Sequence, residues 1–314
     1  MATIGIDVGG GSIKGALVNE ENQIVKQCTR VNRINRSSEE MAEDMADIIR
    51  ELTQDGPAEA VGIGLPGTVD DEAGVVVYTP NVGFRKYDLR AALKEMTGYE
   101  VHLINDANAA AFAESQIGAA QGAESVVVVT LGTGIGGGVV IGGKLLTGYT
   151  GAASELGHMV IVKDGEPCGC GRKGCFEAYA SATALVRMAK KAMAEHPESM
   201  MNELAEKDGK VGARTAFEAY DAGDPTAVSV VNEYLDWLAE GLANLINIFF
   251  PEVIALSGGI ANRGESLIKA LEERVYPRTH GSAYALKRTK LAICSLGYES
   301  GMIGAALYAK SVME

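Results

Sequence analysis

Along this chain, hydrophobic and polar positions alternate with the period of a strand in some segments and with the period of a helix in others. Each change from one period to the other predicts a new element. Two short apolar runs at 3–8 and 12–18 flank three glycines and predict a β-hairpin. Residues 37–52 open with Ser and Glu in capping positions and continue with helical periodicity, which predicts a helix. The other elements expected in this part are buried strands at 60–67 and 101–104 and helices at 87–98 and 106–118.

The pattern restarts at residue 125, where two strands at 125–130 and 136–143 again flank a glycine-rich turn. The later elements expected are helices at 175–196, 224–250 and 299–310, a buried strand at 252–259, and a loop or short helices at 197–217. Two lobes that each open with a strand–glycines–strand hairpin indicate an internal duplication. We expect lobes at 1–115 and 116–314 that meet at a cleft, and the terminal helix is a candidate to pack back on the first lobe.

The composition indicates a globular protein with small-molecule partners. The 314 residues are 47% hydrophobic, and the formal net charge of −13 makes nucleic acid and anionic membranes unlikely partners. The N-terminus has no secretory pattern, and the odd number of five cysteines favours a reducing compartment, so we expect the cytoplasm. Cys28 and Cys294 are expected to be core thiols.

Two nucleotide-binding motifs can be rejected. Residues 132–137 spell G-x-G-x-x-G, but a dinucleotide-binding loop precedes a helix, and here a strand is expected to follow. Gly138 and Lys144 have the spacing of a Walker A loop, but Leu145 stands where a hydroxyl must hold magnesium.

What remains is the pair of glycine-rich hairpins. Glycines let backbone N–H groups approach phosphate closely, Asp7 suits an outer ligand of Mg²⁺, and Lys14 offers a positive charge. A single hairpin of this kind is equally well explained as a tight turn with an exposed aspartate. Two of them, one opening each lobe, favour a nucleotide clamped between the lobes.

Seven motifs together resemble the ROK family of sugar kinases in the actin-like ATPase superfamily. They are DVGGGSIKG at 7–15, GLPGTVD at 64–70, INDANAAAFAE at 104–114, LGTGIGGGVVIGGKLLTG at 131–148, GAASELGHMVI at 151–161, CGCGRKGCFEAYAS at 168–181 and ALSGG at 255–259. The resemblance implies an α/β protein with the two-lobed actin-like (ribonuclease H-like) ATPase fold and a central cleft that holds ATP and a hexose.

The resemblance also implies site residues. Asp106 resembles the general base that accepts the proton of the sugar hydroxyl, although an aspartate here also suits a helix N-cap. Asn105, Asp106, Glu155, His158 and Glu177 resemble the sugar ligands. The residues that resemble the ATP and Mg²⁺ site are Asp7, Gly9, Gly10, Gly11, Ser12, Lys14, Gly132, Thr133, Gly134, Gly136, Gly137 and Gly138, with Gly258 and Gly259 at the adenosine.

A histidine and three cysteines have the spacing of a metal site. His158, Cys168, Cys170 and Cys175 form H-x9-C-x-C-x4-C, a Cys3His set that matches closed tetrahedral Zn²⁺. A C-x-C disulfide has poor spacing, and nothing in the sequence marks a catalytic cysteine. The site would fix Glu155 and Glu177, which flank it in the sequence.

The resulting hypothesis is an ATP-dependent kinase of carbohydrate metabolism that phosphorylates the primary hydroxyl of a hexose. Glucose (glycolysis) is the leading substrate, and N-acetylmannosamine, allose and fructose stay open. The chain departs from the family pattern at Gly11, Ser154 and the segment 80–84. The first departure leaves polyphosphate open as the donor, and the last leaves the hexose open. The rival class is a sugar-responsive regulator without a DNA-binding domain. A homodimer is suggested only by the family.

Overall fold

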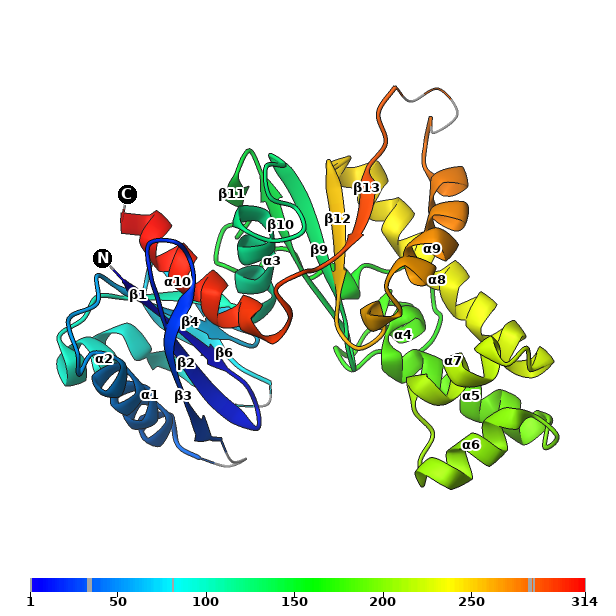
Figure 1. The fold of residues 1–314 in the computed structure, drawn as a ribbon, viewed down its shortest axis with the longest axis horizontal. Coiled ribbons are helices and arrows are strands. Elements are labelled where there is room, and N and C mark those ends of the chain that lie inside the picture. The colour runs from blue at the N-terminus through cyan, green and yellow to red at the C-terminus, as the bar shows by residue number, and fades with distance from the viewer. Residues whose placement is uncertain (1, 33–35, 81, 282–283, 285, 314) are drawn as a thin grey trace. The chain divides into compact units, whose positions relative to one another are not determined.

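A computed structural model describes residues 2–32, 36–80, 82–281, 284 and 286–313. Over these residues the protein is mixed α/β, with three sheets and ten α-helices (Figure 1). Contacts group the chain into two compact units. Unit 1 comprises 1–128, 138–154 and 294–314, and unit 2 comprises 129–137 and 155–293. The two lobes expected from the sequence, with their boundary near residue 115, stay a prediction.

The main sheet of unit 1 has the strand order β3-β2-β1-β4-β8. Its strands are β1 (Thr3–Val8), β2 (Ser12–Val18), β3 (Ile24–Val31), β4 (Val61–Leu65) and β8 (Val101–Asn105). β1 and β2 are antiparallel, which confirms the first hairpin, whereas β4 runs parallel to both β1 and β8. The ends of β1, β4 and β8 therefore meet at one edge, which is where ligands bind in open α/β sheets.

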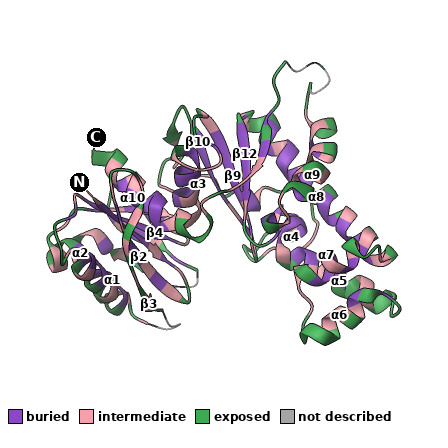
Figure 2. Cartoon of the chain, in the orientation of Figure 1, coloured by how far each residue is buried: buried purple, intermediate pink, exposed green. Residues whose placement is uncertain are grey.

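Four helices cover the two faces of this sheet: α1 (Ser38–Leu52), α2 (Leu89–Thr97), α3 (Asp106–Gln116) and α10 (Ser300–Met313). Bulky side chains of β1 and β4 join the core with α1 and α2, and this core appears as the buried interior in Figure 2. Glycines alternate with them and face α10. A Cβ at Gly5 or Gly62 would lie 1.8 Å from a carbonyl oxygen of α10, so only glycine allows this close packing. The terminal helix thus packs on the first sheet.

Helix α1 begins with the capping pair expected from the sequence. The Ser37 hydroxyl accepts from the backbone N–H of Glu40, and the Glu40 carboxylate accepts from the backbone N–H of Ser37. We expect Ser37→Ala to lower the free energy of unfolding by about 1 kcal/mol. Urea unfolding would measure this difference. Ser38→Ala is the control, because Ser38 lies outside the capping pair, and equal losses in both variants would contradict the prediction.

Unit 1 also contains a three-stranded sheet that the sequence does not predict. It consists of β5 (Thr68–Asp70), β6 (Val75–Tyr78) and β7 (Arg85–Asp88) in that order. These strands have three or four residues, and β7 has the sequence RKYD. The hydrophobic pattern of a strand or a helix is therefore not visible in them. The helix expected at 87–98 accordingly begins only at Leu89, with Asp88 as its N-cap.

The second five-stranded sheet has the order β11-β10-β9-β12-β13. Its strands are β9 (Ser125–Leu131), β10 (Ile135–Ile141), β11 (Lys144–Leu145), β12 (Val253–Ser257) and β13 (Lys290–Ile293). If the strands of each sheet are counted along the chain, both sheets have the order 3-2-1-4-5. This repetition of the strand order agrees with an internal duplication. β9 and β10 contribute residues to both units.

The helices of unit 2 correct one prediction. They are α4 (Glu177–Ala180), α5 (Ala182–Glu195), α6 (Met200–Asp208), α7 (Ala213–Asp221), α8 (Pro225–Phe249) and α9 (Glu265–Arg278). The single helix expected at 175–196 is wrong. Ser181 is extended and its side chain caps α5 by accepting from Ala184 N–H, so the chain breaks there. The short helices expected at 197–217 are α6 and α7, whereas α9 was not predicted.

The two cysteines outside the metal cluster are half-buried, so they are not the enclosed core thiols that were expected, although Cys28 packs against the core of unit 1. Cys28 lies on the edge strand β3 and is half-buried, and Cys294 follows β13 and is half-buried too. The alternating pattern of β3 leaves every residue of this strand at least partly accessible. Among the described residues, no helix is both long enough and apolar enough to cross a bilayer.

Candidate active site

Asp7 lies near the end of β1, opposite Lys14 of β2. The pKa of Asp7 is raised to about 6, chiefly by burial and also by the charge of Asp106, while Lys14 acts in the opposite direction. A poorly solvated carboxylate beside a second carboxylate is stabilised by a cation, so this position fits the predicted outer ligand of Mg²⁺. The Lys14 ammonium lies 6.0 Å from the centre of the Tyr298 ring.

Asp106 is the first residue of α3 and is not its cap. Asn105 is the N-cap, because its side chain accepts from the backbone N–H of Asn108 at 3.1 Å. The N-cap interpretation of Asp106 is therefore wrong. The Asp106 carboxylate instead accepts from the backbone N–H of Ala107 at 2.8 Å, and burial raises its pKa. A raised pKa makes an ionised carboxylate a stronger proton acceptor, as a general base requires.

Asn105 has both ends of its amide engaged within unit 1. Its Oδ1 caps α3, and its Nδ2 donates to the Gly67 carbonyl at 2.9 Å. The residue also lines a cavity of about 320 Å³ between the β5–β6 connection, the end of β8 and residues 147–151. As a predicted sugar ligand it retains one N–H and one lone pair.

The second glycine turn is held by side chains from two directions. Thr130 Oγ1 accepts from Gly136 N–H, and Glu177 Oε2 accepts from Ile135 N–H, both at 3.0 Å. A Cβ at position 134 would lie 2.1 Å from Glu177 Oε2, so the turn requires glycine there. Glu177, predicted as a sugar ligand, therefore also contacts the predicted phosphate turn.

The four predicted metal ligands come together within unit 2, and their ligand atoms all lie within 4.8 Å of one another. His158 Nδ1 is 3.6 Å from Cys168 Sγ, and Cys170 Sγ is 3.7 Å from Cys175 Sγ. Zinc with Zn–S of about 2.3 Å and Zn–N of about 2.0–2.1 Å separates tetrahedral ligand atoms by roughly 3.5–3.8 Å. The cluster thus fits structural zinc. Burial is the main cause that raises the pKa of Cys168 to about 12, whereas a backbone hydrogen bond from Arg172 lowers the pKa of Cys170.

The metal cluster also adjoins the predicted sugar ligands. Glu177 Oε1 lies 3.3 Å from Cys168 Sγ. Glu155 is exposed and directly precedes the short helix Leu156–His158, which carries the histidine of the cluster. Ser154 adopts a left-handed backbone with φ of 65°, a conformation that favours glycine.

The remaining predicted nucleotide residues lie on turns. Gly258 follows β12 with φ of +93°, and a Cβ there would be 2.4 Å from the Leu131 carbonyl oxygen, so this position requires glycine. A Cβ at Gly259 would meet nothing within 4 Å. In the segment at 80–84, where the chain departs from the family pattern, Asn81 lies outside the described residues and Phe84 is buried.

Each unit brings together part of the predicted site. Unit 1 holds Asp7, Gly9, Gly10, Gly11, Ser12, Lys14, Asn105, Asp106 and Gly138. Unit 2 holds Gly132, Thr133, Gly134, Gly136, Gly137, Glu155, His158, Cys168, Cys170, Cys175, Glu177, Gly258 and Gly259.

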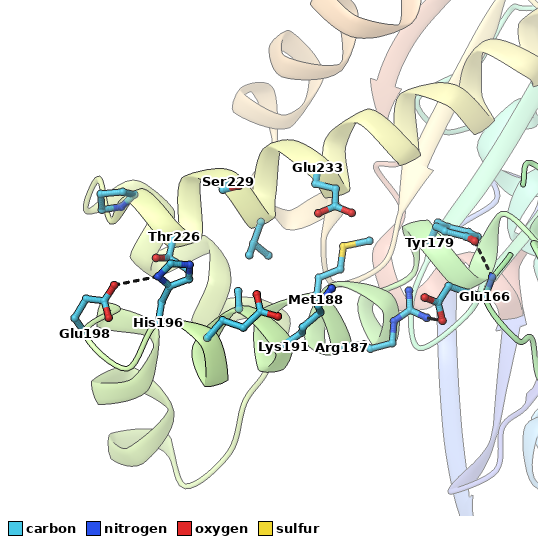
Figure 3. Close-up of a pocket in the computed structure, with 14 residues that line it drawn as sticks. Glu166, Tyr179, Arg187, Met188, Lys191, His196, Glu198, Thr226, Ser229 and Glu233 are labelled. Atoms are coloured by element: carbon cyan, nitrogen blue, oxygen red, sulfur yellow. Dashed lines mark hydrogen bonds and ion pairs between the residues drawn. The ribbon is translucent and has the colours of Figure 1, made fainter.

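A second cavity, of about 580 Å³, lies within unit 2. Residues of α5 and α8 line most of it, and none of its lining residues was predicted as a site residue (Figure 3). Its charges are largely paired, as Arg187 bonds Glu166 at 2.6 Å and His196 contacts Glu198 at 3.1 Å. This cavity gives no indication of phosphoryl-transfer chemistry.

Three polar residues at the glycine turns were missed from the sequence. Thr130 precedes the second turn, whereas Asn32 and Thr183 reach the two turns from β3 and α5. Thr130 could have been suspected, because a threonine just before a glycine turn can bond the turn itself. The other two contacts join residues more than 20 positions apart, for which the sequence carries no signal.

Comparison with known proteins gives a family and several activities. A model of the ROK family matches residues 3–312. A glucokinase from Thermotoga maritima is 40% identical over 273 residues, which cover 87% of this chain and 86% of that protein. The crystal structure of a ROK family glucokinase from Streptomyces griseus in complex with glucose and AMPPNP matches with a TM-score of 0.82 and 35% identity, covering 99% of this chain and all of that one. The expected fold class is confirmed.

A third relative has a different role. The xylose repressor of Bacillus subtilis is 30% identical over 298 residues, which cover 92% of this chain but 73% of the repressor. The same fold therefore occurs in enzymes and in regulators.

Proposed function

The chain belongs to the ROK family, and on that premise we propose that it transfers the γ-phosphoryl group of ATP to the primary hydroxyl of a hexose, with glucose as the leading substrate. The observation that carries the proposal is Asp106, a half-buried carboxylate with a raised pKa at the start of α3. The named activities of the glucokinase relatives support the same reaction.

The chemistry assigned to Asp106 is proton acceptance. As the hexose oxygen attacks the γ-phosphorus, the hydroxyl proton passes to the Asp106 carboxylate and the bond between γ-phosphorus and the ADP oxygen breaks. The sugar would be oriented by Asn105, Glu155, His158 and Glu177. Amide N–H groups of the two glycine turns would bind the phosphates. Local donors of this kind are needed because the phosphates carry several negative charges and the protein is acidic overall.

Two metals enter the proposal in different roles. Mg²⁺ neutralises charge on the nucleotide phosphates, and Asp7 is the residue that would hold it through water. Zn²⁺ would be held by His158 and the three cysteines as a structural ion. These residues fix the chain between Glu155 and Glu177, and hence would orient two sugar ligands.

The proposal is tested by a hexose screen. Purified protein is incubated with ATP and Mg²⁺ and with glucose, N-acetylmannosamine, allose or fructose in turn, and ADP release is measured. We expect glucose to give the highest kcat/KM. Replacing ATP by polyphosphate, with glucose 6-phosphate as the readout, tests the alternative donor. The absence of ADP release with every sugar would refute the ATP-dependent kinase.

A regulator is the second candidate, favoured by the likeness to the xylose repressor. A regulator would bind its sugar without turnover. Calorimetry would then show hexose binding, and addition of Mg²⁺–ATP would release no ADP. The kinase also implies a cytoplasmic protein with access to ATP, and we propose a homodimer. Light scattering coupled to gel filtration would measure the assembly.

Asp7 yields a prediction about pH and stability. Because its pKa is raised from 3.8 to about 6, the folded protein holds a proton there that the unfolded chain has lost. The resulting stabilisation is fully present below pH 3.8 and is lost as pH rises through 6. The charged form therefore destabilises the ligand-free protein at pH 7.5 by roughly 1–3 kcal/mol. We expect Asp7→Asn to raise Tm at pH 7.5 while lowering kinase activity.

Thermal unfolding without ligands at pH 7.5 and 4.5 measures this effect. The gain in Tm should shrink at the lower pH, where the wild-type carboxyl is mostly protonated. Asp88→Asn is the matched control, because Asp88 is exposed and caps α2 equally well as asparagine. A Tm of Asp7→Asn that is equal to or below wild type at pH 7.5 would show that the Asp7 charge is not destabilising.

A further inference from the structure

We propose that Asn32 and Thr183 are positioning residues for the phosphates of the nucleotide. Each holds a carbonyl group of one glycine turn from one side, and so turns the next backbone N–H toward the other side. The inference rests on the proposed function, because it assumes that phosphate binds at these turns. It adds two residues that lie outside the glycine motifs themselves.

The first turn joins β1 to β2 and is closed by a bond from Gly9 N–H to the Ser12 carbonyl at 2.9 Å. Asn32, which follows β3 and is only 6% exposed, makes two bonds to it. Its Nδ2 donates to the Gly9 carbonyl at 2.8 Å, and its backbone N–H donates to the Gly11 carbonyl at 3.1 Å. One buried residue therefore fixes two of the carbonyl groups in the turn.

Fixing a carbonyl also fixes the next amide. A peptide unit is planar and trans, so its C=O and N–H groups point in opposite directions. With the Gly9 and Gly11 carbonyls directed at Asn32, the N–H groups of Gly10 and Ser12 are directed away from it. Gly10 and Gly11 are exposed, and a Cβ at either would meet nothing within 4 Å. The side opposite Asn32 is thus open to a ligand that accepts hydrogen bonds.

The second turn shows the same arrangement with different residues. Thr183 Oγ1 donates to the Thr133 carbonyl at 2.6 Å, and Ala182 N–H donates to the Gly132 carbonyl at 2.9 Å. By the same peptide geometry, the N–H groups of Gly134 and Thr133 are directed away from α5. Successive N–H groups directed to one side form an anion-binding concavity. In both turns, therefore, residues outside the turn bind its carbonyl groups and leave its N–H groups directed to the opposite side.

The Asn32 side chain has a further feature. Its Oδ1 is buried and has no hydrogen-bond partner among the described residues. A buried acceptor without a partner destabilises a fold. The favourable contribution of this side chain therefore lies in what its Nδ2 donates to the turn.

Thr183 gives the sharper test, because its hydroxyl can be removed without changing its shape. We expect Thr183→Val to raise the KM for ATP roughly three- to tenfold, as loss of one such hydrogen bond predicts, with the KM for the hexose within twofold of wild type. Thr183→Ser keeps the hydroxyl and should restore the wild-type KM. Thr53→Val is the control, since it removes a hydroxyl-to-carbonyl bond of 2.8 Å at the end of α1.

Asn32 is tested in parallel. Asn32→Ala should raise the KM for ATP by a similar factor, and Asn32→Asp should raise it more, because an oxygen would face the Gly9 carbonyl. Asn202→Ala is the control, since Asn202 also donates its amide to a backbone carbonyl, at 3.1 Å, far from either turn in the sequence. Because the two residues act on separate turns, the effects of Asn32→Ala and Thr183→Val should multiply in the double variant.

The outcomes separate this inference from the proposed function. If the wild type does not phosphorylate any hexose, the proposed function fails. If the wild type is active and Thr183→Val keeps its KM for ATP within twofold, the inference fails. It fails equally if the KM values for ATP and hexose rise together, since that indicates a general structural loss. Should Asn32→Ala not fold, the Thr183 variants decide.

Discussion

Asp106→Asn is expected to lower kcat by roughly 10²–10⁴-fold while the affinity for hexose stays close to wild type. An amide keeps the shape of the side chain and can still accept from Ala107 N–H, so the start of α3 should persist. It cannot accept the hydroxyl proton, and the reaction then has to release that proton to water. The loss should therefore appear in kcat and not in sugar binding.

The measurement is steady-state kinetics with the preferred hexose, together with calorimetric titration of the sugar. Asp88→Asn serves again as the matched control, because it removes the same charge at the start of another helix and should keep full activity. In the wild type, kcat/KM should fall at low pH as Asp106 is protonated, and burial raises the pKa of Asp106, so this fall begins above the ordinary range of aspartate. Turnover of Asp106→Asn within threefold of wild type would remove Asp106 from the role of base.

Loss of the metal cluster is expected to have the second large effect. The purified protein should contain about one zinc per chain, and Cys170→Ser should abolish this content, since a closed site needs all four ligands. Acid and strong chelators should promote zinc loss from the wild type, because zinc binds thiolates. Glu177 contacts both Cys168 and the second glycine turn, so we expect at least a tenfold rise in the KM for hexose and a smaller rise for ATP.

Metal analysis by mass spectrometry and separate titrations of sugar and nucleotide check these expectations. Cys170 is exposed, so the substitution leaves the core intact. Cys28→Ser is the control, because Cys28 lies in unit 1 and outside the cluster. Normal sugar phosphorylation by protein that contains no zinc would show that the metal does not organise the site.

The sequence predicts those parts of the fold whose pattern is local. The hairpin at Gly9–Gly11 and the helix capped by Ser37 follow from turn chemistry and from spacing within a few residues. The Cys3His cluster is equally readable, since three of its ligands lie within eight positions. The short polar strand β7 has no such pattern, and the break at Ser181 resembles an ordinary helical residue until its side chain is seen to cap α5.

Only those residues of the candidate site that belong to a sequence motif could be predicted. Asp7 was found beside the first glycine-rich hairpin and Asp106 through the family resemblance, but their mutual influence depends on β1 lying beside β4, and β4 beside β8. Asn32 and Thr183 belong to no motif, and they matter through contacts with Gly9 and Thr133, which lie 23 and 50 positions away. Such contacts arise from packing, which a single sequence does not display.

The glycine face of the first sheet has a consequence for synthesis of the protein. β1 is among the first segments to leave the ribosome, whereas α10, which covers Gly5 and Gly62, is made about 290 residues later. At about 5–20 residues per second this delay is roughly 15–60 s. During that time residues 155–293 can fold, while the first sheet has one face uncovered. Chains that end before Ser300 and have been released from the ribosome should therefore be protected from protease in unit 2 and cleaved in unit 1.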